Sequence, residues 1–129
     1  MGIDFGEKRI GMALGDDDLK MAQPLSTWMG AKGEFLGELR SLVAEHGVAG
    51  LVVGLPRGLE GQETAQTRLV LEFVSVLRST LSQPVAVQDE ALTSEVALER
   101  LKQRGEAIVP GAVDREAARI ILQDYLDSL

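Results

Sequence analysis

The opening of this chain constrains its fold more than any other stretch, because it places a carboxylate inside an apolar run punctuated by glycines. Its first residues have the pattern of a strand, a tight turn and a second strand, with Gly2 and Gly6 allowing close approach of backbone or ligand. Asp4 lies within the first strand, where a carboxylate is costly to bury unless a cation or hydrogen-bond donors compensate it. Lys8 and Arg9 follow at the turn. An acid that can hold a metal, beside bases that can hold a phosphate, indicates phosphoryl chemistry.

Four segments of the sequence resemble, in the same order, the motifs of the YqgF (RuvX) family, whose members are described as Holliday junction resolvases and pre-16S rRNA nucleases. They are 4–11 (DFGEKRIG), 53–56 (VGLP), 88–94 (QDEALTS) and 113–126 (VDREAARIILQDYL). Together they extend over nearly the whole chain, which makes the resemblance far more specific than one glycine-rich hairpin would be. It implies a ribonuclease H-like fold and a divalent-metal-dependent endonuclease that hydrolyses phosphodiester bonds of structured nucleic acid.

The length and composition indicate one globular domain over residues 1–129. A chain of 129 residues, 45% hydrophobic and 26% charged, is large enough to bury a core and too short for two domains. It has no apolar run of membrane-spanning length and no signal-peptide pattern, so a cytoplasmic protein with no membrane partner is expected. The absence of cysteine excludes disulfides and thiolate sites, and a single histidine, His46, argues against zinc hydrolysis.

The net charge of −7 argues mildly against a broad, nonspecific nucleic-acid binder, which normally presents a basic face. It does not exclude a nuclease, because metal ions offset the carboxylates of such a site and basic residues can gather on one side. The candidates for that side are Lys8, Arg9, Arg57, Arg100, Lys102, Arg104, Arg115 and Arg119. With one Trp, one Tyr and three Phe, the chain has no aromatic array for stacking single-stranded bases, so recognition of backbone and shape is expected.

Periodicity along the chain predicts three hairpin-linked strands followed by helices and two further strands. After the opening strand, strands are expected near 10–14, 21–25, 51–53 and 85–87, and helices over 31–45, 64–81, 93–104 and 114–127. Right-handed crossovers place the fourth and fifth strands beside the first, giving a mixed α/β sheet in the order 3-2-1-4-5 with helices on both faces. Such a sheet binds ligands beyond the carboxyl ends of its central parallel strands, where Asp4, the loop after Gly54 and Asp89–Glu90 fall.

Asp4, Glu90 and Asp114 are the expected catalytic acids and metal ligands, with Asp89 as a fourth candidate ligand. Two divalent cations, Mg²⁺ or Mn²⁺, can activate a water and stabilise the pentacoordinate phosphorus if a few carboxylates from separate segments hold them. Strand alternation puts Asp89 and Glu90 on opposite faces, so one of the two is expected to face the site. The usual family pattern Asp-Glu-Arg-Leu-Thr favours Glu90, while the arginine of that pattern is replaced here by Ala91.

Structural roles compete with the functional ones for these acids. Asp4 can be a turn-former at a strand end, Asp89–Glu90 a polar strand terminus, and Asp114 the N-cap of the last helix. Asp114 nevertheless shares its helical face with apolar residues, so it is expected to point toward the end of the sheet. Those residues are Ala117, Ala118, Ile121 and Tyr125. The exposed side of this helix is expected to carry Glu116, Asp124 and Asp127.

The residues expected to contact nucleic acid lie in or beside the four motifs. They are Lys8, Arg9, Arg57, Thr93 and Arg115. The segment 54–64 is glycine-rich and leads into a helix, whose N-terminal NH groups could bind a phosphate; a flexible connector is the competing interpretation. The expected partner is structured RNA or branched DNA, and symmetric cutting of two strands would require a homodimer.

Two other interpretations compete with a metal-dependent nuclease. A sugar-kinase or actin-like ATPase also contains an Asp-x-Gly hairpin, but it needs two such domains and a second phosphate loop, for which this chain has no room. A non-catalytic ribosome-assembly or nucleic-acid-binding factor could use the same cleft without turnover, and metal binding by the acids distinguishes it from an enzyme. Asp16–Asp18 is expected to be a solvated turn, because the spacing and the trailing Glu of a calcium loop are missing.

Overall fold

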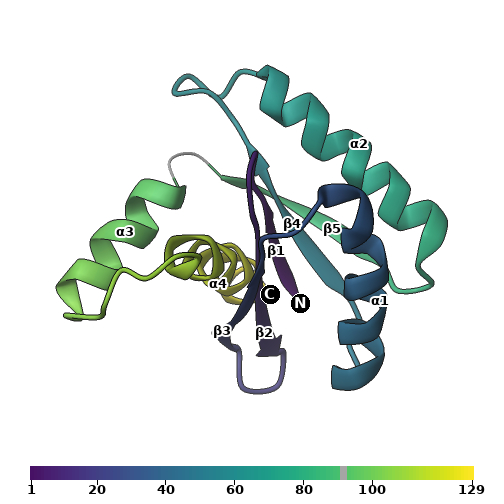
Figure 1. Cartoon of the computed structure of the whole chain (residues 1–129), viewed down its shortest axis with the longest axis horizontal. Helices are drawn as coiled ribbons and strands as arrows, with labels where there is room; N and C mark the ends of the chain where they lie inside the picture. Colours follow the sequence, from purple (N-terminus) through teal and green to yellow (C-terminus); the bar gives the residue numbers. More distant parts are fainter. Residues whose placement is uncertain (91–92) are drawn as a thin grey trace.

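The computed structural model describes residues 1–90 and 93–129, with side chains over 1–90 and 95–129, and contains a five-stranded mixed sheet flanked by helices (Figure 1). The strands are β1 (Gly2–Phe5), β2 (Ile10–Asp16), β3 (Met21–Trp28), β4 (Leu51–Pro56) and β5 (Val85–Glu90). The helices are the 3₁₀ turn η1 (Lys32–Glu34), α1 (Phe35–His46), α2 (Ala65–Thr80), α3 (Thr93–Gln103) and α4 (Ala112–Asp127). The strand order β3-β2-β1-β4-β5 confirms the predicted topology, with antiparallel pairs on the β3 side of β1 and parallel pairs on the β5 side.

Alternation along the central strands separates two hydrophobic cores. Ile3, Val53 and Val85 belong to the larger core, which α1 and α2 cover. Ala13 and Val52 belong to the second core, on the opposite face, which packs against α4. Figure 1 shows α1 and α2 on one side of the sheet, α4 on the other and α3 outermost. The apolar run of β4 is therefore covered on both faces, as its sequence predicts. Among the helices described, none is long and apolar enough to cross a bilayer.

The two strands that follow the hairpins extend further toward their carboxyl ends than predicted. β4 continues through Gly54 to Pro56 and β5 through Gln88 to Glu90, in unbroken parallel register. The polar end of β5 has the composition of a loop, but backbone pairing with β4 carries the strand past it. Asp89 and Glu90 are therefore the last two residues of β5 and do not follow it.

The helix α4 lies directly on the sheet because a glycine leaves room for it. Gly11 of β2 faces the first turn of α4, and a Cβ there would lie 1.9 Å from the carbonyl oxygen of Asp114. The helix begins at Ala112 and its N-cap is Gly111, whose φ of 85° suits glycine. The expectation that Asp114 caps this helix is therefore wrong, because Gly111 turns the chain into the helix earlier and places Asp114 inside the first turn.

Glu116 is buried, although the helical pattern predicts a solvated residue. Its side chain is 1% exposed, and it accepts hydrogen bonds from Nη2 of Arg104 at 2.7 Å and from Nε of Arg119. The cause is α3, which packs Ala97 against Ala117 on this side of α4. The periodicity shows one buried face, whereas α4 has two, one against the sheet and one against α3.

We expect Glu116→Gln to lower the free energy of unfolding by about 2–3 kcal/mol, because it removes the charge that compensates two arginines at a buried position. The loss should be smaller than for a fully buried pair, since the side chains of Arg104 and Arg119 are 41% and 16% exposed and can reach water. Urea unfolding followed by the fluorescence of Trp28, the single tryptophan, measures the change.

The control for this variant is Asp124→Asn, on an exposed part of the same helix, which should change the free energy of unfolding by less than about 0.5 kcal/mol. Equal unfolding midpoints for Glu116→Gln and the wild type would show that the buried ion pairs add nothing to stability.

Candidate functional site

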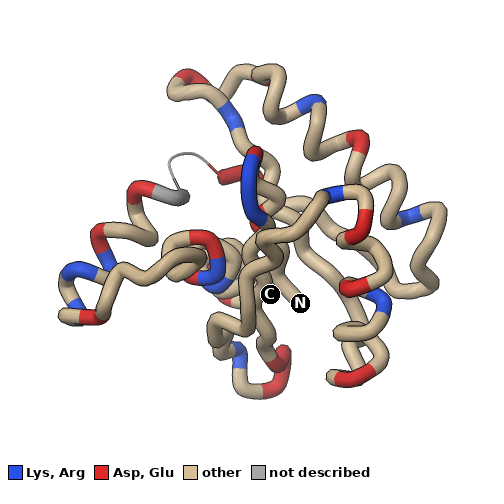
Figure 2. The backbone as a smooth tube through the Cα atoms, in the orientation of Figure 1, with Lys and Arg blue, Asp and Glu red and all other residues tan. Residues whose placement is uncertain are grey.

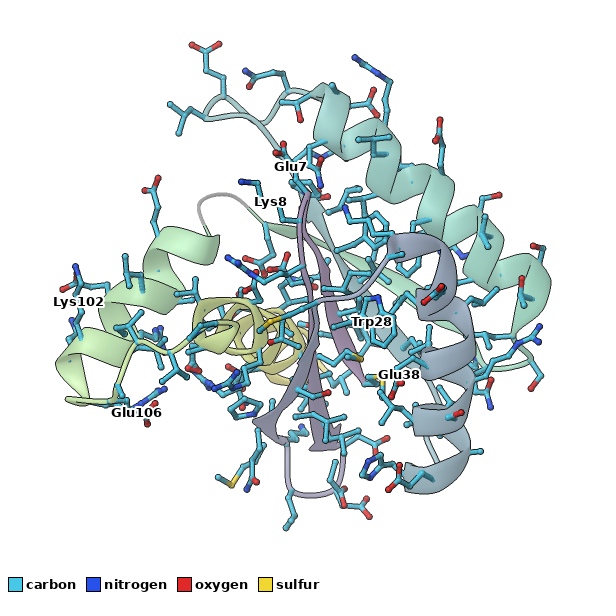
Figure 3. All side chains as sticks on the ribbon, in the orientation of Figure 1. Glu7, Lys8, Trp28, Glu38, Lys102 and Glu106 are labelled. Atoms are coloured by element: carbon cyan, nitrogen blue, oxygen red, sulfur yellow. The ribbon has the colours of Figure 1, made fainter. Side chains whose placement is uncertain are left out.

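The candidate site lies where the carboxyl ends of β1, β4 and β5 meet the first turn of α4. These three strands run parallel, so their carboxyl ends lie at one edge of the sheet. Asp4 lies in β1, Glu90 ends β5 and Asp114 lies in the first turn of α4. Figure 3 labels Glu7 and Lys8, which mark this end of β1. Three of the sequence-predicted acids, from segments far apart in the chain, thus reach the same end of the sheet.

Asp4 and Asp114 lie close together because both adjoin Gly11 of β2. Asp4 pairs with Gly11 in the β1–β2 register, and Gly11 is the residue against which the backbone of Asp114 packs. Burial, and then the negative charge of Asp114, raise the pKa of Asp4 from 3.8 to about 7. A carboxyl group in this environment favours either a proton or a cation beside it. The pair therefore has the electrostatic character of a cation-binding site.

Asp4 and Glu90 point to the same face of the sheet. Gly2 and Gly54 both lie directly under α4, so alternation places Asp4 and Pro56 on that face as well. Pro56 pairs with Glu90, and paired residues of adjacent parallel strands point the same way. Glu90 therefore faces α4, and its Oε1 atom is shielded from solvent.

Asp89 points to the opposite face. Its side chain is 66% exposed, and its Oδ1 atom lies 3.3 Å from Nε of Arg57. Arg57 also lies 3.8 Å from Glu63, in the segment that leads to α2. Strand alternation separates the two neighbouring acids as predicted, and of the two it is Glu90 that shares the face of Asp4.

The three carboxylates are spread and do not form a compact cage. Within the part of the chain that the structure describes, the acids whose ligand oxygens all lie within 4.8 Å of one another are those of the exposed triplet Asp16–Asp18. There, Oδ1 of Asp16 accepts a backbone hydrogen bond at 2.7 Å, as in the solvated turn that the sequence predicts. Magnesium keeps several waters and needs only one or two direct carboxylates, so the wider spacing of Asp4, Glu90 and Asp114 is compatible with it.

Basic side chains surround this end of the sheet and differ in their pairing. Nε of Arg9 lies 2.8 Å from Oδ2 of Asp114. Lys8 is exposed and Arg115 is half-buried, and neither forms an ion pair with the acids that the structure describes. Figure 2 shows that both basic and acidic positions occur along the backbone at this end of the sheet.

The segment between β4 and α2 is held at both ends. The backbone NH of Arg57 donates to the carbonyl oxygen of Glu90 at 3.2 Å, which ties the start of the segment to the end of β5. Thr64 caps α2, and its hydroxyl accepts a hydrogen bond from the backbone NH of Thr67 at 3.3 Å. These bonds fix the backbone of Arg57 at the end of β5, while its side chain pairs with Asp89 on the face opposite Asp4 and Glu90.

Two side chains that the sequence does not single out hold the end of β1 from the other face. Nζ of Lys32 donates to the carbonyl oxygen of Gly6 and lies 4.5 Å from the centre of the Phe5 ring. Nε2 of Gln66 donates to the carbonyl oxygen of Phe5 at 3.1 Å. Burial lowers the pKa of Lys32. No local pattern indicates these roles, because η1 and α2 reach the hairpin only through the tertiary fold.

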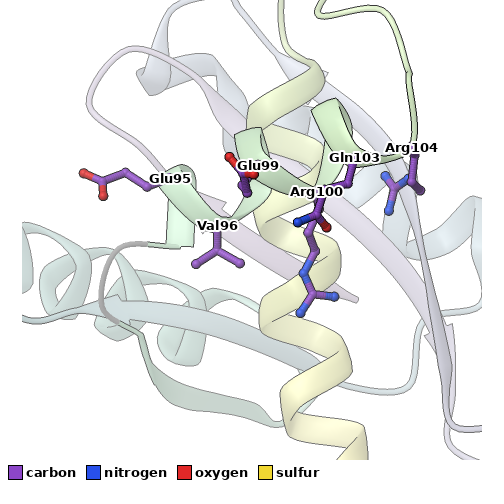
Figure 4. A pocket seen from close by; sticks show the side chains of 6 residues that line it. All are labelled: Glu95, Val96, Glu99, Arg100, Gln103 and Arg104. Carbon is purple, nitrogen blue, oxygen red and sulfur yellow. The ribbon is translucent and has the colours of Figure 1, made fainter.

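A pocket lies along α3 and the residue that follows it (Figure 4). Its lining residues are Glu95, Val96, Glu99, Arg100, Gln103 and Arg104. It includes Arg100 and Arg104, two of the candidates for a basic side. Among the described residues, none of the predicted acids Asp4, Asp89, Glu90 and Asp114 lines it, so it does not extend the carboxylate site. Thr93 begins α3, but its side chain and all of Ala91 lie outside the described residues.

Comparison with known proteins links this geometry to one family. The model of the RuvX family, described as Holliday junction resolvase, matches residues 1–128. A protein of Chloroflexus aurantiacus named "Putative pre-16S rRNA nuclease" is 41% identical over 131 residues, which cover 99% of this chain and 86% of that protein. Proteins of the same name from Syntrophus aciditrophicus and Orientia tsutsugamushi are 41% and 36% identical, covering 100% and 98% of this chain and 88% and 82% of their own lengths.

A solved structure shares the architecture. RuvC from Thermus thermophilus matches with a TM-score of 0.56 and 16% sequence identity, covering 98% of this chain and 93% of that chain. At this identity the match shows the fold alone, which is ribonuclease H-like, as the sequence motifs imply.

Proposed function

This chain belongs to the RuvX family, and on that premise we propose that it is a divalent-metal-dependent endonuclease that hydrolyses phosphodiester bonds of structured nucleic acid. The observation that carries the proposal is the convergence of Asp4, Glu90 and Asp114 on one face, at the carboxyl end of the central strands. Parallel strands of an open α/β sheet bind their ligands at this end.

The donor set suits Mg²⁺ or Mn²⁺. The three proposed ligands offer only carboxylate oxygens, which hard divalent cations prefer, and the chain has no cysteine and only one histidine. When bound, such a cation would polarise the scissile phosphate and activate the attacking water. The protein's own part is to hold Asp4 in a half-buried environment where its charge favours a cation. Lys8, Arg9 and Arg115 are the side chains that we expect to bind backbone phosphates.

The proposed substrate class follows from the relatives' names. They name a pre-16S rRNA nuclease, and the family description names a Holliday junction resolvase, so both substrates are structured nucleic acids. We take a structured precursor of 16S rRNA as the first substrate to test and a four-way DNA junction as the second. Symmetric cutting of a junction would also require two copies of the site, as in a homodimer.

The test is metal titration followed by a cleavage assay. Wild-type protein should bind Mn²⁺ in calorimetry and cleave one of the two substrates when Mn²⁺ or Mg²⁺ is present. Asp114→Asn should bind the ion more weakly and lose cleavage, because it removes a charged ligand from the pair with Asp4. Asp124→Asn removes the same charge from an exposed position further along the same helix and should behave as the wild type.

Two outcomes would contradict the proposal. Wild-type protein that binds either nucleic acid without binding metal would favour a non-catalytic assembly factor. Equal cleavage by Asp114→Asn and Asp124→Asn would show that the acids of this face are not the reactive site.

A further inference from the structure

Arg9 joins the β1–β2 hairpin to α4 through the candidate metal site. Its Nε donates to Oδ2 of Asp114 at 2.8 Å, across 105 residues of sequence. The side chain of Arg9 is 45% exposed, whereas that of Asp114 is only 17% exposed. The guanidinium therefore approaches the acid from the solvent side and lies at the mouth of the site.

Arg9 compensates the negative charge of the neighbouring acids Asp4 and Asp114. Asp4 and Asp114 approach each other through the contact of α4 with Gly11, and two neighbouring carboxylates repel unless a cation lies beside them. Within the described residues, Arg9 is the cation that forms an ion pair with either acid. A divalent cation bound by the same acids would supply the compensation that Arg9 supplies through this ion pair, and it would repel the guanidinium.

We propose that Arg9 is an exchangeable counter-ion: it neutralises Asp114 while the site holds no metal, and metal binding releases it to bind a phosphate of the nucleic acid. This inference rests on the proposed function, because it uses the same acids as metal ligands. It assigns Arg9 two successive partners, an acid of the site and then the substrate backbone.

The geometry of the hairpin allows this exchange without refolding. The backbone of the turn is fixed by a hydrogen bond from the NH of Gly6 to the carbonyl oxygen of Arg9 at 3.0 Å, so only the side chain has to move. Within the described residues, the two Nη groups of Arg9 donate to no protein acceptor. A guanidinium with free Nη groups can bind a phosphate through two parallel hydrogen bonds.

Metal affinity separates a counter-ion from a residue that only orients Asp114. If Arg9 competes with the metal, Arg9→Gln should bind Mn²⁺ about tenfold more tightly than the wild type in calorimetry, because a repelling charge has been removed. If Arg9 instead orients Asp114 as an outer-shell partner, the same variant should bind Mn²⁺ about 10–100-fold more weakly. Weaker or unchanged binding overturns the inference.

Lys8→Gln is the matched control. It removes one positive charge from the neighbouring position of the same turn, but Lys8 makes no ion pair with Asp114. Its Mn²⁺ affinity should change much less than that of Arg9→Gln. Equal tightening in both variants would mean that general charge, and not the contact with Asp114, controls the affinity, and this result would also overturn the inference.

Nuclear magnetic resonance reads the release of Arg9 directly. The Nε–Hε signal of Arg9, identified by its loss in Arg9→Gln, should move from the position of a carboxylate-bound group to that of a solvated one as Mg²⁺ is added. An unchanged signal at saturating Mg²⁺ would contradict the exchange. Failure of the wild type to bind metal would overturn the proposed function together with this inference, whereas metal binding without exchange would overturn this inference alone.

Discussion

Asp4→Asn should reduce the rate of cleavage by about a thousandfold or more while leaving the protein folded. The substitution keeps the shape of the side chain but removes the charge of the one acid that lies in the central strand, next to Asp114. Loss of a single electrostatic contact to a transition state costs about 10²–10³-fold in rate, and loss of a metal ligand should cost at least as much. Single-turnover cleavage over a range of Mn²⁺ concentrations measures the effect.

The Mn²⁺ dependence makes this result specific. Raising the concentration of Mn²⁺ should not restore the rate of Asp4→Asn, because the remaining acids do not replace the missing charge. Asp124→Asn, purified in parallel, should retain the wild-type rate and so excludes loss of activity during preparation. Cleavage by Asp4→Asn at the wild-type rate would indicate either a contaminating nuclease or a reactive site elsewhere.

The topology of this protein follows from its sequence because the relevant forces are local or directional. Alternating apolar residues define the strands, and the right-handed crossover rule then leaves one arrangement around β1. Alternation also puts Asp89 and Glu90 on opposite faces of the sheet. The register between β4 and β5 then shows that Glu90 is the one on the face of α4. The end of the sheet at which the acids gather could be predicted for the same reason.

Features that depend on packing between distant elements could not be predicted in this way. The burial of Glu116 depends on α3, which gives α4 a second covered face that one helical period does not show. The position of Asp114 inside the helix depends on the left-handed turn at Gly111. The contacts of Lys32 and Gln66 with the hairpin arise only when η1 and α2 reach the end of β1. In each case the deciding partner is remote in sequence and carries no local pattern.

The stability of the metal-free protein should fall as the pH rises from about 4 to about 7, and Asp4 is the reason. Its pKa is 3.8 in an ordinary environment and about 7 in the folded protein. Between these values the folded state holds a proton that the unfolded state has released, so raising the pH favours unfolding. The stabilising contribution is complete below pH 4 and is lost above pH 7. The pKa difference corresponds to at most about 4 kcal/mol.

Asp4→Asn isolates this effect, because asparagine cannot titrate. At pH 8 without metal, the variant should be more stable than the wild type by up to about 4 kcal/mol, whereas near pH 4 the two should unfold alike. Urea unfolding at both pH values, in the presence of a chelator, gives the comparison. Asp124→Asn should keep the pH dependence of the wild type.

Adding Mn²⁺ at pH 8 should reverse much of this difference. The ion binds the folded wild type and should stabilise it by about 2.7 kcal/mol at a hundredfold excess over its dissociation constant. The Asp4→Asn variant lacks the charge that the ion requires, so its midpoint should move little. The carboxylate of Asp4 would then lower the free energy of unfolding without metal and raise it when Mn²⁺ is bound. Equal stability of the wild type and Asp4→Asn at pH 8 without metal would show that the ionised carboxylate of Asp4 does not destabilise the folded protein. The electrostatic argument for a cation between Asp4 and Asp114 would then fail.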